Sequence, residues 1–233
     1  MTLKECFEKN GLSEYMTPEK EEKLLILCEL LLEYNEKVNL TALTEPDDIY
    51  AKHIADSVML LPYLRGRKTL LDVGCGGGFP SLPVAILNEN IAVTAMDSTK
   101  KKLDFVLFAK DRLGLENITA LNGRAEELCG TALRESFDAV TARAVASLPV
   151  LCELCIPYVK PGGVFLAMKT DEKEVQSAGA AAKETGASHA EYVKYKLICG
   201  SEEADRCIII FDKIRHTPYK FPRKYAMIKS HPL

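Results

Sequence analysis

Residues 69–80, Thr-Leu-Leu-Asp-Val-Gly-Cys-Gly-Gly-Gly-Phe-Pro, are the part of the sequence that most restricts the fold. A short apolar run ends in a cluster of glycines, and a proline follows where a helix can start. This order predicts a buried strand, a turn with few side chains and then a helix. Asp97 ends the next apolar run, 23 residues after Gly74. A carboxylate at that distance can accept hydrogen bonds from ribose hydroxyl groups, so the pattern indicates a nucleotide-like ligand.

The spacing of the glycines narrows the ligand. Gly74, Gly76 and Gly78 allow the backbone to approach a ligand where any Cβ atom would collide. A dinucleotide fingerprint needs a further glycine where this sequence has Phe79. The pattern Asp-x-Gly-x-Gly-x-Gly instead resembles the first motif of class I methyltransferases, whose donor, S-adenosylmethionine, has no phosphate. A glycine-rich turn without a ligand is the alternative, but the strand, the proline and Asp97 argue against it.

Apolar runs and helical patterns alternate from residue 69 onward, which predicts parallel strands joined by crossover helices. We expect strands at 69–73, 91–96, 118–121, 137–142 and 163–168, and helices near 80–88, 100–114, 148–158 and 172–185. Pro161-Gly-Gly is expected to form the turn into the fifth strand. Two more strands, 191–198 and 206–212, are expected to add an antiparallel hairpin. The fold class is therefore α/β, a Rossmann-like, mostly parallel seven-stranded sheet.

The chain divides into three segments. Residues 1–62 are expected to form a helical extension, with one helix from the Thr17 cap to about Glu36 and another from about Glu45 to Leu61. Residues 63–212 form the expected ligand-binding domain. Residues 213–233 form a basic tail, which carries six Lys and Arg residues and no acid. Tyr219, Phe221 and Tyr225 alternate with these charges, a composition that favours a polyanion as partner, although solvated charge clusters are also common.

Composition excludes several classes of protein. No run of 18 apolar residues is present and the first ten residues lack a signal-peptide core, so we expect a cytoplasmic protein without a membrane partner. The eight cysteines are scattered among apolar positions, which fits a reducing compartment. Cys152 and Cys155 form the one Cys-x-x-Cys pair, and without further ligands at zinc spacing they favour core packing over a metal site.

Several motifs together resemble one family, the bacterial 16S ribosomal RNA guanine-N7 methyltransferases, also called glucose-inhibited division protein B. The resemblance spans nearly the whole chain and rests on the following segments: Asn39-Leu-Thr, His53-Ile-Ala-Asp-Ser, Leu71-Asp-Val-Gly-Cys-Gly-Gly-Gly-Phe-Pro, Asp97-Ser, Gly123-Arg-Ala-Glu-Glu, Thr141-Ala-Arg-Ala-Val-Ala-Ser-Leu, Ala167-Met-Lys and Thr217-Pro-Tyr-Lys-Phe-Pro-Arg-Lys. Two features depart from the family pattern. Gly77 replaces a proline, and the tail from Tyr225 onward is apolar where the family tends to be Gly/Pro-rich and basic.

The resemblance implies methyl transfer from S-adenosylmethionine to N7 of a guanine in 16S rRNA. Gly74 and Phe79 would line the amino-acid and sulfonium end of the donor. Asp97 would hold the ribose, and Ala125 and Glu126 would flank the adenine. N7 carries a free lone pair, so we expect no strong general base, and positioning and electrostatics should supply the catalysis.

Arg143 follows the fourth strand and is the best candidate for joining donor and RNA, because a guanidinium can bond a carboxylate, a phosphate or a guanine edge. An ion pair at a strand end is the alternative. Lys169 is a second candidate for contact with phosphate or the target base. His53 and Asp56 are expected to bond each other and to hold the N-terminal helices over the site.

RNA binding is expected to use five tail residues, Lys213, Arg215, Lys220, Arg223 and Lys224. The expected partner is 16S rRNA, the 30S subunit or an assembly intermediate, and the protein is expected to be monomeric and free of metal. Two other functions fit the same motifs. A small-molecule methyltransferase would share the donor site, and a non-catalytic RNA-binding or assembly factor would retain the fold without the reaction.

Overall fold

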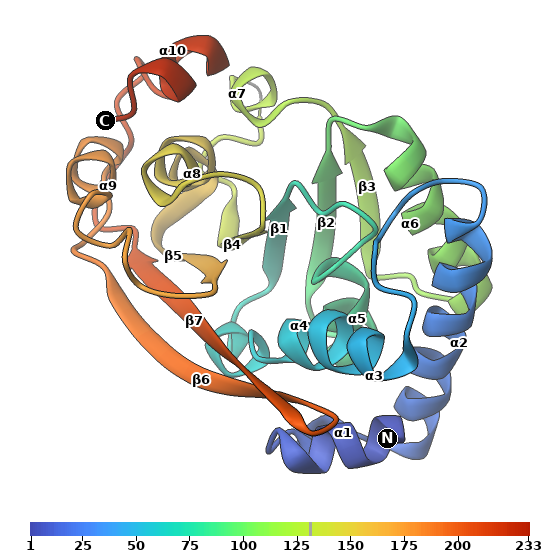
Figure 1. The fold of residues 1–233 in the computed structure, drawn as a ribbon. Helices are drawn as coiled ribbons and strands as arrows, with labels where there is room; N and C mark the ends of the chain where they lie inside the picture. Colours follow the sequence, from blue (N-terminus) through green and yellow to red (C-terminus); the bar gives the residue numbers. More distant parts are fainter. Residues whose placement is uncertain (131) are drawn as a thin grey trace.

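The computed structural model describes residues 1–130 and 132–233, which form an α/β fold around a seven-stranded sheet (Figure 1). The strands are β1 (Thr69–Val73), β2 (Ala92–Asp97), β3 (Ile118–Asn122), β4 (Phe137–Arg143), β5 (Val159–Lys169), β6 (Glu191–Cys199) and β7 (Glu202–Asp212). Their spatial order is β3-β2-β1-β4-β5-β7-β6. β1 to β5 pair in parallel, and the hairpin of β6 and β7 joins β5 antiparallel, as the sequence predicted.

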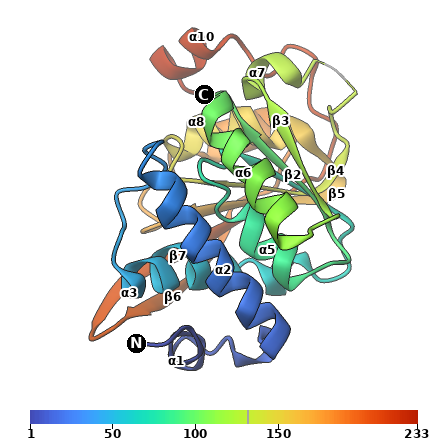
Figure 2. The same cartoon turned by 90° about the vertical axis from the view of Figure 1, so that its right-hand side faces the viewer.

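Helices cover both faces of the sheet. The α-helices are α1 (Leu3–Lys9), α2 (Pro18–Asn35), α3 (Pro46–Asp48), α4 (Asp56–Val58), α5 (Ser81–Leu87), α6 (Lys100–Leu113), α7 (Ala125–Leu128), α8 (Leu148–Cys155), α9 (Gly179–Thr185) and α10 (Tyr225–Ser230). Four short 3₁₀ or π segments accompany them: η1 (Ser13–Tyr15), η2 (Ile49–Ala55), η3 (Leu61–Leu64) and η4 (Ile156–Tyr158). Figure 2 shows α2 crossing over α5 and α6, both of which it contacts.

Alternation along β1 divides the core into two apolar layers. Leu70 is fully buried in a layer with α1, α2, α5 and α6, whereas Leu71 is fully buried in a layer with α8, α9 and α10. Successive side chains of a strand point to opposite faces, so one strand supplies both layers. Cys152 and Cys155 are fully buried in the second layer, which confirms that they pack in the core.

The expected turn at Pro161-Gly-Gly is wrong in detail. β5 begins at Val159, which pairs with Phe137, and pairing with β4 resumes where Val164 meets Ala139. The residues between are therefore a bulge within one long strand. Gly163 packs so tightly there that a Cβ atom would lie 2.7 Å from the carbonyl oxygen of Asp138. The sequence marked the irregularity correctly, but it did not show that strand pairing continues on both sides of it.

The N-terminal segment is helical, as expected, with two differences. α1 was not predicted; the side chain of its cap residue, Thr2, accepts a hydrogen bond from the Glu5 backbone, and the Glu5 carboxylate accepts one from the Thr2 backbone N–H. The single helix expected from 45 to 61 is instead a series of short segments that includes the π-helix η2. π segments are rare and occur often at functional sites, and η2 carries His53.

Candidate functional site

Two neighbouring cavities open at the carboxyl ends of the parallel strands, where ligands of open α/β sheets bind. The first, of about 300 Å³, is called here the glycine-loop pocket and is lined among others by Gly74, Asp97, Gly123, Arg124, Ala125, Glu126 and Tyr225. The second, of about 400 Å³, is called the basic cavity and is lined among others by Lys52, His53, Asp56, Arg143, Lys169 and Arg206. Both volumes fall near the lower end of the roughly 300–1,000 Å³ typical of small-molecule sites.

The three predicted glycines differ in what they do. A Cβ atom on Gly74 would lie 2.5 Å from Cγ2 of Val145, and one on Gly78 would lie 2.6 Å from Cδ1 of Leu82. Gly74 lines the glycine-loop pocket, whereas Gly78 allows α5 to pack closely. Gly76 has open space around it and donates its N–H to Asp97 at 3.0 Å. Gly76 and Gly78 therefore shape the loop and do not line the pocket.

Asp97 is the last residue of β2, and only 8% of its surface is exposed. Its Oδ2 accepts the Gly76 N–H at 3.0 Å, and its Oδ1 accepts the Thr99 N–H at 2.8 Å. These two bonds fix the carboxylate, which lines the glycine-loop pocket, and each oxygen has a second lone pair for a further hydrogen bond. The geometry suits a ligand with two neighbouring hydroxyl groups.

Ala125 and Glu126 begin α7 and line the same pocket. The carbonyl of Ala125 accepts a hydrogen bond of 2.5 Å from the buried Tyr158 hydroxyl, which ties α7 to the core. Glu126 is largely buried and lies 3.9 Å from the guanidinium of Arg124. The structure thus brings Gly74, Asp97, Ala125 and Glu126 together around one space, although their strands are separate in the sequence.

Phe79 does not line the glycine-loop pocket, which corrects its expected place. It is 6% exposed and stacks against the His53 ring, with centroids 4.5 Å apart and planes inclined by 17°. The side chain therefore packs against η2, which carries His53. Phe79 supports the basic cavity through His53.

Arg143, the last residue of β4, lies in the basic cavity and does not line the glycine-loop pocket. Its Nη1 donates to the carbonyl of Lys52 at 2.7 Å and to Oδ2 of Asp56 at 3.0 Å. Its Nη2 lies 3.3 Å from Nδ1 of His53. The expected bond between His53 and Asp56 is therefore replaced by contacts of both residues with Arg143.

His53 is held in its neutral form. Burial, and to a smaller extent the nearby charge of Arg143, lower its pKa to about 4. Because Arg143 can only donate, Nδ1 must accept, and Nε2 then carries the proton that it shares with Oγ1 of Thr41 at 2.7 Å. Both ring nitrogens are engaged, so His53 is a positioning residue for Arg143.

Asp56 and Lys169 complete the cavity. Asp56, 4% exposed, also accepts a bond of 2.7 Å from the Tyr195 hydroxyl and lies 3.7 Å from Nε of Arg206. Lys169 ends β5, and its Nζ donates to the carbonyl of Ala146 at 2.8 Å and pairs with Glu174 at 3.2 Å. Four cationic side chains and one carboxylate thus line the space. Neither Tyr195 nor Arg206 was singled out from the sequence, since their strands join the site through the antiparallel hairpin.

Ala144 separates the two cavities and lines both. Its φ of +57° is a left-handed conformation that alanine rarely adopts. The backbone turns sharply there, so Arg143 faces the basic cavity while Val145 lies over Gly74 in the glycine-loop pocket. Nothing in residue type marks this position, and only its place after the β4 strand could have suggested it.

The basic tail is more deeply packed than the sequence predicted. Lys213 is 2% exposed, and its Nζ pairs with Glu135 at 3.2 Å and donates to the carbonyl of Ile156 at 3.1 Å. Burial lowers the pKa of Lys213 to about 8. The expectation that Lys213 contacts RNA is wrong in this structure, because a phosphate cannot reach its ammonium group. Three other predicted tail residues, Arg215, Lys220 and Lys224, are exposed.

Arg223 is also paired within the protein. Its Nε and Nη2 bond the Glu153 carboxylate at 2.8, 3.1 and 2.6 Å, and its backbone N–H donates to the same group at 2.8 Å. The Glu153 side chain is fully buried in α8. The charge of Arg223 is thereby neutralised, so its role is to hold the tail and not to present a free cation to RNA.

Membrane-spanning helices and metal-ligand clusters are both absent from the described residues. None of the helices in the described part of the chain is both long and apolar enough to cross a membrane. No group of three or more His, Cys, Asp or Glu side chains among residues 1–130 and 132–233 is arranged to hold a metal ion.

Comparisons with known proteins give one consistent result. The family model GidB, described as rRNA small subunit methyltransferase G, matches residues 20–203. The chain is 40% identical over 223 residues to a ribosomal RNA small subunit methyltransferase G of Clostridium botulinum, covering 94% of this chain and 92% of that protein. It is 39% identical over 232 residues to the protein of the same name from Bacillus subtilis, with 96% of each covered.

Solved structures show the same fold at lower sequence identity. An O-methyltransferase from Bacillus cereus in complex with SAH aligns with a TM-score of 0.57 and 18% identity, covering 81% of this chain and 91% of that chain. A precorrin-6y C5,15-methyltransferase from Geobacter metallireducens aligns with a TM-score of 0.54 and 17% identity, covering 67% and 87%. The sheet and its helices therefore form a Rossmann-like methyltransferase fold.

Proposed function

The chain belongs to the GidB family of rRNA small subunit methyltransferases, and we propose that it transfers a methyl group to N7 of one guanine in 16S rRNA. S-adenosylmethionine is the methyl donor. The observation that carries the proposal is the junction at Ala144, where the glycine-loop pocket meets the basic cavity. A donor in the first and a base in the second would meet across a single residue.

The glycine-loop pocket fits the donor. Asp97 offers two fixed carboxylate oxygens for the ribose hydroxyl groups, and Gly74 lines the pocket where the amino-acid end would lie. Ala125 and Glu126 flank the space where the adenine would lie, and the Glu126 carboxylate can accept a hydrogen bond from the adenine amino group. When bound, S-adenosylmethionine supplies an electrophilic methyl group on a sulfonium.

The basic cavity fits a guanine whose N7 is the nucleophile. Guanine presents two acceptors, O6 and N7, on its major-groove edge. A donor group such as Lys169 or Arg143 can bond O6 and leave the N7 lone pair free to attack. No proton leaves N7 in this reaction, so no general base is required, and His53 has both ring nitrogens occupied. Fixed positions for the two reactants account for the catalysis.

The tail would grip RNA through its exposed cations. Arg215, Lys220 and Lys224 remain accessible, and Lys220 forms an ion pair of 3.3 Å with the half-buried Glu184. Three phosphate contacts would give a slope of roughly −2 to −3 in a plot of log affinity against log salt. Replacing the three residues with alanine should therefore flatten the slope by that amount. This substitution is a cleaner test than removal of the tail, because removal would also delete the buried Phe221 and Ile228 and expose the apolar core that they cover.

We further propose that the protein acts as a monomer in the cytoplasm on 16S rRNA, within the 30S subunit or an assembly intermediate. Naked rRNA, intact 30S particles and immature particles from cells lacking the gene can be compared as substrates under the same conditions. The preferred substrate identifies the stage of assembly. Sedimentation of the protein alone and with each particle gives the oligomeric state.

The function is tested with tritiated S-adenosylmethionine and small subunits from cells that lack the gene. Wild-type protein should label one guanine, located by borohydride reduction and chain cleavage at N7-methylguanine. Lys169→Ala should lower the rate, because it removes a donor to the base, whereas Lys173→Ala should not, because Lys173 is 85% exposed and outside both cavities. Labelling of small metabolites but not of rRNA would reject the proposal, and so would failure to bind S-adenosylhomocysteine.

A further inference from the structure

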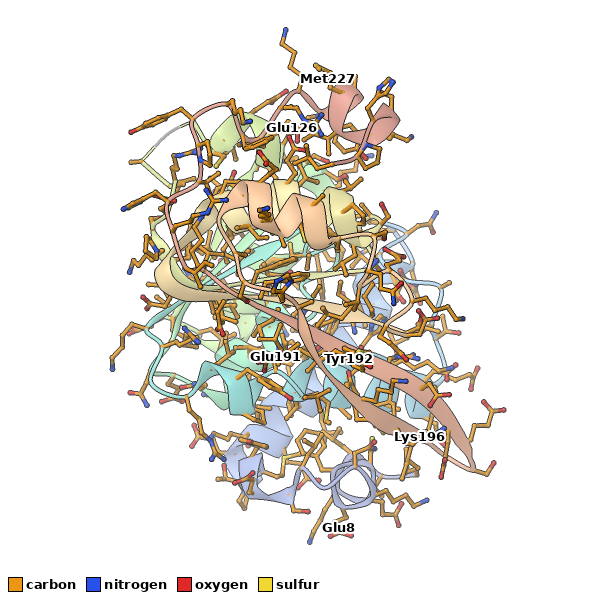
Figure 3. The ribbon with its side chains drawn as sticks, turned by 90° about the vertical axis from the view of Figure 1, so that its left-hand side faces the viewer. Glu8, Glu126, Glu191, Tyr192, Lys196 and Met227 are labelled. Carbon is orange, nitrogen blue, oxygen red and sulfur yellow. The ribbon has the colours of Figure 1, made fainter. Side chains whose placement is uncertain are left out.

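The C-terminal tail returns to the glycine-loop pocket. After β7 the chain passes along α8 and ends in α10, which lies beside α7 (Figure 1). Figure 3 shows Met227 of α10 and Glu126 of α7 at the same end of the molecule, far from Lys196 of β6. Tyr225, the first residue of α10, lines the glycine-loop pocket together with Glu126 and Leu154.

The tail reaches this position along a fixed path. Arg134 donates to the backbone carbonyls of Phe221 and Thr217 at 2.8 Å each and to that of Pro218 at 3.0 Å. Phe221 is only 3% exposed, and Ile228 of α10 is fully buried against the second apolar layer. Residues on both sides of Tyr225 are therefore packed into the core.

Glu153 and Arg223 fix the segment immediately before Tyr225. The side-chain carboxylate of Glu153, fully buried, accepts four hydrogen bonds from the backbone and side chain of Arg223. A bidentate pair of this kind restricts the relative orientation of the guanidinium and the carboxylate. Tyr225 follows two residues later and is half-buried, so its ring cannot move far from the pocket while the pair is intact.

The Tyr225 ring also has a partner across the pocket. The guanidinium carbon of Arg124 lies 5.8 Å from the centre of the ring, a cation–π contact. Arg124 and Tyr225 line the glycine-loop pocket together with Ala125 and Glu126, where the proposed function places the adenine. An aromatic ring and a guanidinium plane are the surfaces on which purines stack.

We propose that Tyr225 is a donor-binding residue that stacks on the adenine of S-adenosylmethionine, so that docking of the C-terminal tail and donor affinity are coupled. The inference rests on the proposed donor site and adds a residue that lies outside the GidB model match, which ends at residue 203. It also gives the apolar tail from Tyr225 onward a function of its own. Removal of the tail would then weaken binding of donor as well as of RNA, contrary to what a simple RNA grip predicts.

The test is the dissociation constant of S-adenosylhomocysteine, measured by calorimetry on the full chain without RNA. Tyr225→Ala should weaken binding roughly 5- to 30-fold, the range for loss of one stacked aromatic at a partly exposed site. Tyr225→Phe keeps the ring and should stay within about twofold of wild type. Tyr219→Ala is the matched control, because Tyr219 is 96% exposed and stacks on Arg134 away from the pocket. It should leave affinity unchanged.

Coupling is tested with Arg223→Ala and the double variant. Both substitutions disrupt the same contact of Tyr225 with the donor, so their effects should not add. The dissociation constant of the Tyr225→Ala/Arg223→Ala double variant should lie within about twofold of that of the weaker-binding single variant. Circular dichroism and thermal melting of each variant separate loss of affinity from loss of fold. Wild-type affinity in folded Tyr225→Ala overturns the inference while leaving the donor site intact. Wild-type affinity in folded Asp97→Ala would instead overturn the donor site itself.

Discussion

Replacing Arg223 with alanine should destabilise the protein, because it leaves Glu153 as an uncompensated charge in the core. The substitution removes three side-chain hydrogen bonds to Glu153, of 2.8, 3.1 and 2.6 Å, and leaves the carboxylate only the bond from the backbone N–H at 2.8 Å. Glu153 is fully buried, and its partner is 21% exposed. The pair therefore resembles a fully buried ion pair, for which removal of one partner lowers the free energy of unfolding by about 3–5 kcal/mol.

Partial access of water to the Arg223 side should reduce this cost to roughly 2–4 kcal/mol. For a chain of this size each kcal/mol lowers the melting temperature by about 2–4 °C, so we expect a loss of roughly 4–16 °C. Glu153→Gln combined with Arg223→Ala should recover part of that loss, since the neutral amide no longer needs a cation. Urea unfolding of the wild type, both single variants and the double variant gives the coupling energy directly.

Lys220→Ala provides the control. Lys220 is 66% exposed and its partner Glu184 is 46% exposed, so its loss should change stability by less than about 0.5 kcal/mol. The reasoning is refuted if Arg223→Ala has wild-type stability but reduced affinity for 16S rRNA. Arg223 would then contact RNA, as the sequence alone suggested.

Three further predictions concern the two cavities and the strand that precedes them. In the folded protein the pKa of His53 is about 4, below its ordinary value, so its neutral form stabilises the fold above about pH 6.5, and this contribution is lost as the pH falls towards 4. Urea unfolding at pH 7 and pH 5 should show a smaller decline in the free energy of unfolding for His53→Gln than for the wild type. Burial raises the pKa of Asp72 to about 6, so its ionised form opposes folding above that pH. Asp72→Asn should therefore raise the free energy of unfolding by up to about 3 kcal/mol at pH 8 and by little at pH 4. Equal gains at both pH values would contradict the raised pKa. Gly74→Ala should abolish binding of S-adenosylhomocysteine, because its Cβ would meet Val145 at 2.5 Å and its φ is +75°; adding Val145→Ala should restore part of the affinity by relieving the clash but not the backbone strain.

The fold could be predicted because each part of it has a local signal. The apolar runs predicted most strand ends to within a few residues. The glycine loop and Asp97 indicated the edge of the sheet at which ligands bind. Parallel connections bring the ends of β1 to β5 to one edge, so residues such as Asp97, Arg143 and Lys169 could be placed there without a structure. The π-helical form of η2 had no such signal, since its pattern is that of an ordinary amphipathic helix.

Pairings between distant residues could not be predicted. Glu153 and Arg223 are 70 positions apart, and nothing in a run of tail cations shows that one of them meets a buried carboxylate. Lys213 and Glu135 illustrate the same limit. Composition reports the charge of a segment, but only tertiary packing decides which charges are neutralised. The division of the site between two cavities, with Arg143 in one and Gly74 in the other, depends on the left-handed turn at Ala144, for which alanine gives no warning.

A crystal structure with bound S-adenosylhomocysteine tests the central claim most directly, because the claim concerns which of two neighbouring cavities receives the donor. The account predicts the ribose on Asp97, the adenine between Ala125 and Tyr225, and the sulfur at Ala144, directed towards Arg143 and Lys169. A ligand lying in the basic cavity, or with its sulfur turned away from Ala144, would contradict it.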